Sequence, residues 1–121
     1  MFSLESDIAR NLLKMTFSGH VREHELAGRE TEMEKALAGL RAGFRFLGDL
    51  TGLEVMEPAC LSYIRRNMDI LNERGVSKVV RIIPDPHKDI GFNILSLFHY
   101  RPGIPIVTCD TLAEADAVLG G

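Results

Sequence analysis

Residues 44–64, FRFLGDLTGLEVMEPACLSYI, hold the strand and the helix start around which the rest of the chain is organised. The segment opens with an apolar run short enough for a buried strand, which closes at Asp49. Thr51-Gly52 is typical of a turn, and Glu57-Pro58 is typical of a helix start, because proline lacks an N–H that would be unpaired there. We therefore expect a buried strand and then a helix that runs to about Glu73. In an open α/β sheet, such a junction is a common place for function.

Composition and charge indicate a single globular domain over residues 1–121. The hydrophobic fraction of 45% and charged fraction of 26% suit a protein with its own core. The net charge of −3 argues against a nucleic-acid or anionic-membrane partner, and the apolar runs are too short for a membrane span. The first residues do not resemble a secretory signal, and Cys60 and Cys109 lack a CxxC spacing. We expect two free thiols and a cytoplasmic location.

The first third of the chain changes from a strand period to a helical one. Alternating apolar residues in 1–21 predict two strands, joined by a turn at 7–11. From Glu25 to Arg41 the apolar positions follow a helical spacing, at Met33, Ala36, Leu37 and Leu40. We expect Gly28 to break or delay the first turn of this helix.

The second half of the chain continues the alternation of strands and helices. Residues 78–83 (KVVRII) predict a buried strand, Asp89 to His99 a third helix, and Ile104 to Cys109 the last strand. Thr111-Leu-Ala-Glu114 is a capping box that opens a short final helix. The order predicts an α/β domain with a mostly parallel mixed sheet of about five strands and about four helices.

The predicted third helix carries apolar residues on two sides. One stripe, made by Ile90, Ile94 and Leu97, is expected to face the sheet. The opposite stripe is made by Phe92, Leu95 and Phe98. An exposed patch of this kind usually marks an interface, so we expect a homodimer or another complex that uses this face.

Several short motifs in this order resemble those of one known family. Residues 13–19 (LKMTFSG) look like its second strand with a closing glycine, and residues 46–51 (FLGDLT) are similar to its central strand. Residues 74–80 (RGVSKVV) match the entry to the next strand, and residues 111–115 (TLAEA) match the last helix. Over residues 11–119 the chain thus resembles the STAS domain, the fold of bacterial anti-sigma-factor antagonists and of the cytoplasmic tails of sulfate transporters.

One departure from the family pattern bears directly on function. Residues 55–60 (VMEPAC) lie where the family carries an apolar pair followed by Asp-Ser-Ser-Gly. In the signalling members the serine phosphorylated by a partner kinase opens this helix, and here that position is Ala59. Alanine has no hydroxyl to accept a phosphate. Ser62 and Thr51 lie nearby in the sequence, but neither occupies the family position.

The resemblance implies a bacterial, cytoplasmic signalling module that is not an enzyme and that docks on an anti-sigma factor or kinase-like protein. It implies no cofactor, metal or catalytic residue. The expected surface joins the start of the second helix to the loop at 85–93 and the third helix. Its residues are Glu57, Pro58, Ala59, Cys60, Ser62, Tyr63, Asp85, His87, Asp89, Phe92, Asn93 and Phe98.

The alternative is a small enzyme or ligand binder at the same sheet edge, with Cys60, Glu57, His87 and Asp89 as candidates. A cysteine near a helix start can have a lowered pKa, but a free cysteine is more often a small buried residue. Glu54 and Glu57 could form an acid–base pair, although acids at this position more often complement a helix N-terminus.

Two further groups of residues have a functional and a structural interpretation. The loop at 85–93 (DPHKDIGFN) follows a buried strand at the edge where ligands bind, yet Asp85 or Asp89 could simply cap the next helix. His20 and His24 have the spacing of two metal ligands on one helix face. The residues around His20 indicate a strand end instead, and no third ligand has a telling spacing, so no zinc site is expected.

Overall fold

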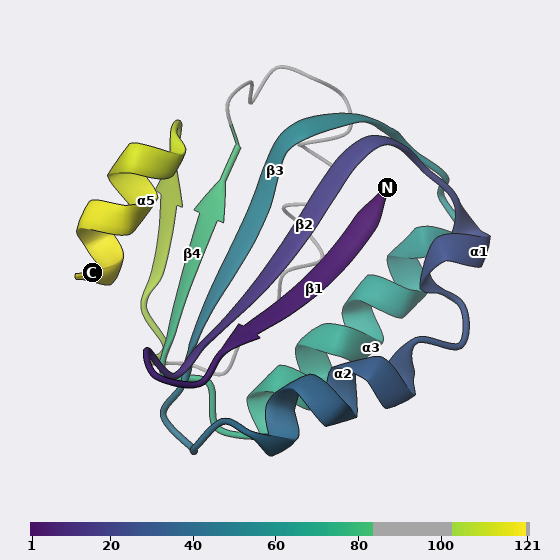
Figure 1. The fold of residues 1–121 in the computed structure, drawn as a ribbon. Helices are drawn as coiled ribbons and strands as arrows, with labels where there is room; N and C mark the ends of the chain where they lie inside the picture. Colours follow the sequence, from purple (N-terminus) through teal and green to yellow (C-terminus); the bar gives the residue numbers. More distant parts are fainter. Residues whose placement is uncertain (84–102, 121) are drawn as a thin grey trace.

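The computed structural model describes residues 1–83 and 103–120, which form one five-stranded sheet with helices on both faces (Figure 1). The strands lie side by side in sequence order, and only the first pair is antiparallel. They are β1 (Phe2–Asp7), β2 (Leu12–Val21), β3 (Arg45–Met56), β4 (Lys78–Ile82) and β5 (Ile106–Cys109). The predicted α/β class and mostly parallel mixed sheet are confirmed.

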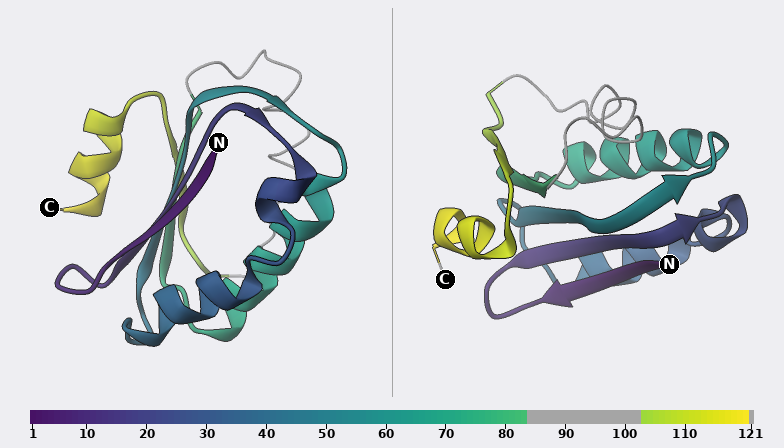
Figure 2. Two further views of the ribbon diagram at one scale, coloured as in Figure 1. Left: turned by 45° about the vertical axis from the view of Figure 1, so that its right-hand side comes forward. Right: turned by 90° about the horizontal axis from the view of Figure 1, so that it is seen from above.

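The helices of the described residues lie in two layers (Figure 2). They are α1 (Glu23–Leu26), α2 (Glu30–Ala38), α3 (Cys60–Glu73) and α5 (Leu112–Leu119). Helices α1, α2 and α3 cover one face of the sheet, and α5 covers β4 and β5 on the other. The predicted helix at 89–99 lies outside the described residues, as do Asp85, His87, Asp89, Phe92, Asn93 and Phe98.

Alternation along the strands produces two separate cores. In β2, the side chains of Met15 and Phe17 enter the core beneath α1, α2 and α3, which we call the large core. Leu12 instead joins the core beneath α5, which we call the small core. Cys60 belongs to the large core and Cys109 to the small core, and both are free thiols, as predicted.

The prediction of one helix from Glu25 to Arg41 is wrong in its boundaries. The chain forms the single-turn helix α1 and then α2, which ends at Ala38. Gly28 separates them with φ of +76°, a conformation that side chains other than glycine's rarely adopt. The predicted apolar face is confirmed, because Met33 and Leu37 of α2 are buried.

The predicted turn at Thr51-Gly52 does not form, since both residues lie within β3, which is twelve residues long and ends at Met56. Gly52 pairs with Ser18 of β2, after an irregularity in the strand register. A Cβ at position 52 would lie 3.2 Å from the Ser18 Cβ, so glycine permits a close approach of two strands here. Strand β2 also continues past the predicted stop at Gly19, and ends at Val21.

The helix ends agree closely with the sequence signals. The cap of α3 is Ala59, so Pro58 precedes the cap by one residue, and Gly75 follows the helix with φ of +89°. The capping box of α5 is confirmed, because Thr111 Oγ1 accepts a hydrogen bond from Glu114 N at 3.2 Å. No helix within the described residues is long and apolar enough to cross a membrane.

Candidate interaction surface

The start of α3 lies at the C-terminal ends of the two longest strands, β2 and β3, beside α1 (Figure 1). Strand β3 ends at Met56, which pairs with Val21 at the end of β2. Directly after it, Glu57 N donates a hydrogen bond to Val21 O at 3.0 Å. The sheet thereby fixes the position at which α3 begins.

Several side chains at this helix start are open to solvent. Pro58, Ala59 and Ser62 are exposed, and Tyr63 is half-buried. The sequence interpretation missed Val55, which is 47% exposed. The pair Val55-Met56 indicates a buried segment, but only Met56 is buried, as strand alternation would have suggested. We call Glu54, Val55, Glu57, Pro58, Ala59, Ser62 and Tyr63 the α3-start surface.

Glu57 stabilises the neighbouring helix α1. Its Oε1 accepts a hydrogen bond from Glu23 N, the first residue of α1, at 2.7 Å. Tyr63 Oη in turn donates to Glu23 Oε1 at 3.3 Å. Glu57 therefore does complement a helix N-terminus, as expected for an acid at this position, but the helix is α1 and not α3. Because Glu57 is engaged with the backbone and Glu54 is exposed with no contact to it, the geometry offers no acid–base pair.

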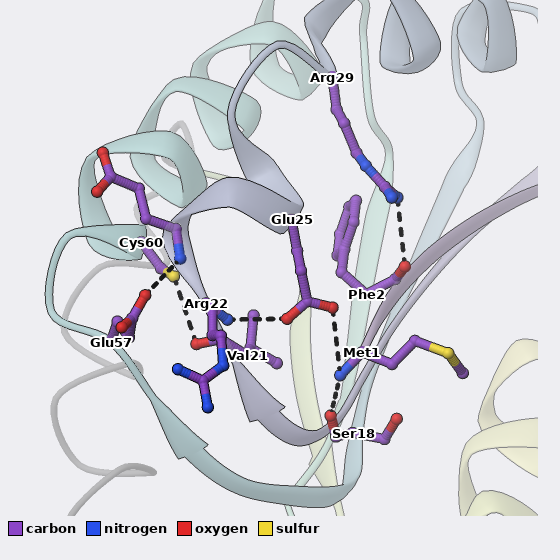
Figure 3. A network of polar contacts seen from close by, with 10 residues as sticks. Met1, Phe2, Ser18, Val21, Arg22, Glu25, Arg29, Glu57 and Cys60 are labelled. Carbon is purple, nitrogen blue, oxygen red and sulfur yellow. Dashed lines mark hydrogen bonds and ion pairs between the residues drawn. The ribbon is translucent and has the colours of Figure 1, made fainter.

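The Cys60 side chain points toward Val21 at the end of β2 (Figure 3). It is fully buried, and its Sγ donates to Val21 O at 3.7 Å. Burial raises the pKa of its thiol, and the carboxylates of Glu57 and Glu23 raise it further. This is the opposite of an activated nucleophile, so Cys60 is a core residue and we leave it out of the α3-start surface.

Next to this junction, Glu25 closes the first turn of α1 (Figure 3). Its Oε2 accepts a hydrogen bond from Arg22 N at 2.8 Å, and its Oε1 lies 3.5 Å from the Met1 ammonium nitrogen. The hydrogen bond from the Arg22 backbone lowers the pKa of the Glu25 carboxyl. The loop that leads from β2 into α1 is therefore held in a defined conformation beside α3.

Position 59 has the geometry of a helix cap without the chemistry of a phosphorylation site. Ala59 is exposed and caps α3 without a side-chain hydrogen bond. The next two amides, of Cys60 and Leu61, already donate to Glu57 O and Pro58 O. The nearest hydroxyl on the helix, Ser62 Oγ, donates to Ala59 O at 3.3 Å.

The two histidines do not share a helix face. His20 lies in β2 and His24 in α1. Within residues 1–83 and 103–120, no group of three histidine, cysteine or acidic side chains is arranged to hold a metal ion.

Comparison with known proteins identifies the fold. No family model matches this sequence, and no curated protein does either. Among solved structures, the chain is similar to the anti-sigma factor antagonist SpoIIAA in its unphosphorylated form, with a TM-score of 0.65 and 16% identity over the full length of both chains. The phosphorylated Bacillus SpoIIAA has a TM-score of 0.64 and 17% identity, over 98% of this chain and 99% of the other.

An anti-sigma factor antagonist from Mycobacterium paratuberculosis is also similar, with a TM-score of 0.60 and 15% identity over 100% of this chain and 94% of the other. The chain therefore has the fold of the anti-sigma factor antagonists, and the STAS fold predicted from its motifs is confirmed. At this level of sequence identity, the likeness establishes the fold alone.

Proposed function

We propose that this protein is a non-enzymatic regulatory module that binds a partner protein through the α3-start surface. The observation that carries the proposal is the open start of α3, held in place by β2, β3 and α1, in a chain with the fold of the anti-sigma factor antagonists. An anti-sigma factor or kinase-like protein, in the cytoplasm of a bacterium, is the partner that this likeness suggests.

The module is constitutive at the family position, because Ala59 has no hydroxyl. Incubation with the cognate kinase, followed by measurement of the intact mass, tests this point. We expect no phosphate on the helix cap. Phosphorylation of Thr51 or Ser62 together with loss of partner binding would contradict the constitutive mode.

Site-specific cross-linking tests the binding surface. A photo-reactive amino acid at position 59 should capture a partner from an extract of the native host. The same amino acid at Ala113, an exposed position on α5, should not capture it. Ala59→Trp should abolish the capture by its bulk, and Ala113→Trp should leave it unchanged. Equal capture from both positions would overturn the proposed surface.

Self-association is a second part of the proposal, and its support is the sequence alone. The stripe of Phe92, Leu95 and Phe98 suggests a homodimer. Sedimentation of the Phe92→Glu, Phe98→Glu double variant should find a folded monomer. A monomeric wild type at high micromolar concentration, with an unfolded double variant, would instead assign these rings to the core.

A further inference from the structure

The α3-start surface carries acidic groups that the described residues do not neutralise. Glu54 and Glu57 belong to this surface, and Glu23 lies against it through its contacts with Glu57 and Tyr63. Within residues 1–83 and 103–120, none of these three carboxylates forms an ion pair. The ion pairs found there engage Glu25, Glu30, Glu32 and Glu34.

Exposed apolar residues lie next to Glu54 and Glu57 in the sequence. Val55, Pro58 and Ala59 are exposed and have short or rigid side chains, which lose little conformational entropy when they are covered.

Arg22 is a cation at the same end of the molecule, next to Glu23 in the sequence. Arg65 lies one turn along α3 from Ser62, and Arg66, whose charge reaches Tyr63, is paired with Glu30. Among the described residues, three carboxylates stand against the guanidinium groups of Arg22 and Arg65, so the local balance of charge is still negative.

An anion is a poor occupant of this helix start. The amides of Cys60 and Leu61, which an anion would need as donors, are bonded to backbone carbonyls. The carboxylates of Glu57 and Glu23 also raise the pKa of the buried Cys60 thiol, as a region of negative potential does. The same sign disfavours nucleic acid and anionic lipid.

We propose that the partner is a protein that places lysine or arginine side chains around an apolar contact, with the apolar group covering Val55, Pro58 and Ala59. This inference rests on the proposed function and adds the chemistry of the partner. Complementary charge at the rim of such an interface speeds association and excludes partners of the wrong sign.

Two labelled helical peptides with identical apolar residues test the inference directly. One carries lysine and arginine beside its apolar stripe, and the other carries glutamate at those positions. Fluorescence anisotropy should show binding of the cationic peptide about ten-fold tighter or more, and this binding should weaken as salt is added. Amide signals of Val55, Ala59 and Ser62 should shift in NMR spectra. Equal binding of both peptides, no binding of the cationic one, or shifts elsewhere would overturn the inference.

A matched pair of charge reversals gives the control. Glu54 and Glu73 are both exposed, and Glu73 lies at the opposite end of α3. Glu54→Lys should weaken binding of the cationic peptide about three- to ten-fold, which corresponds to a contribution near 1 kcal/mol from a charge at the rim. Glu73→Lys should change it less than about two-fold, because an exposed charge that far away is screened. An equal effect of both variants would overturn the inference.

The outcomes also separate this inference from the proposed function. Suppose that a host partner cross-links at position 59, but that its affinity changes neither with salt nor with Glu54→Lys. This result would overturn the inference and leave the proposed function standing. If position 59 captures no partner, the proposed function fails, and the inference fails with it.

Discussion

Among the described residues, three helices cover the large core on one face of the sheet, and α5 covers the small core on the other. The large core draws on four strands and includes completely buried rings such as Phe17, Phe44 and Phe46. The small core has no aromatic residue among its buried members. Free energy from burial scales with the apolar area removed from water, so the two faces contribute very unequally to stability.

Polar contacts hold both ends of the helix that covers the small core. Thr111 caps the start of α5. At the other end, Lys78 Nζ donates to Val118 O at 2.9 Å, and the Arg45 guanidinium donates to Leu119 O. The α3-start surface belongs to the large-core face, so we expect α5 to loosen before the α3-start surface does.

The largest effect is expected from Phe46→Ala in the large core. Phe46 is fully buried, and its truncation leaves a cavity that rigid strands cannot close. The expected loss in the free energy of unfolding is about 3–5 kcal/mol, measured by urea denaturation. Phe46→Leu should lose much less, because it keeps most of the volume. A loss below about 1 kcal/mol for the alanine variant would contradict the ranking of the two cores.

Leu119→Ala probes the small core in the same way. Leu119 is 4% exposed and is the last residue of α5, where the structure can relax. We expect a loss of about 2 kcal/mol, the low end for such a truncation. Hydrogen exchange should rise in α5 and stay low in α3. Leu112→Ala on the same helix is the control, because Leu112 is 43% exposed and should change stability by less than about 0.5 kcal/mol. Equal losses for both variants would argue against a packed small core.

Local patterns sufficed where one segment determines its own structure. The alternation in residues 1–21 and the capping box at Thr111 both predicted elements that form. Thr51-Gly52 misled, because glycine serves turns and close strand contacts alike, and only the pairing with Ser18 distinguishes them. The helix predicted from Glu25 is divided at Gly28, where the sequence predicted a break or delay in its first turn.

The α3-start surface was less predictable, because its contacts join residues that are distant in sequence. The hydrogen bond from Glu23 N to Glu57 spans 34 residues, and no periodic pattern encodes it. Burial of Cys60 depends on how the end of β2 meets α3. The position of Ala59 was predictable, since it follows from the family motif and a helix signal. The charge around Ala59 could not be predicted in this way, because it depends on which neighbouring carboxylates form ion pairs in the folded chain.

Thr111→Ala should have a smaller effect, confined to the small-core face. The variant removes the acceptor for Glu114 N and should cost about 1 kcal/mol. Thr111→Ser keeps the hydroxyl and should restore most of this loss. Thermal unfolding monitored by circular dichroism measures both. If the serine variant is as unstable as the alanine variant, the contribution of Thr111 comes from its methyl group and not from the cap.

The last prediction changes no residue and compares the two cores through their own cysteines. Cys60 is 0% exposed and Cys109 is 3% exposed, and burial raises the pKa of both thiols above the ordinary value of 9.0. Neither is therefore a thiolate at neutral pH, and alkylation must wait for local opening. Mass spectrometry of the native protein with iodoacetamide should find slow labelling at both sites, faster at Cys109, because α5 opens more readily. The rates should increase as the pH rises toward 9.0, because the opened thiols regain their ordinary pKa and ionise over that range. In denaturant, two thiols per chain should react. Faster labelling of Cys60 would reverse the ranking of the cores, and fewer than two thiols without reductant would contradict the free state of both.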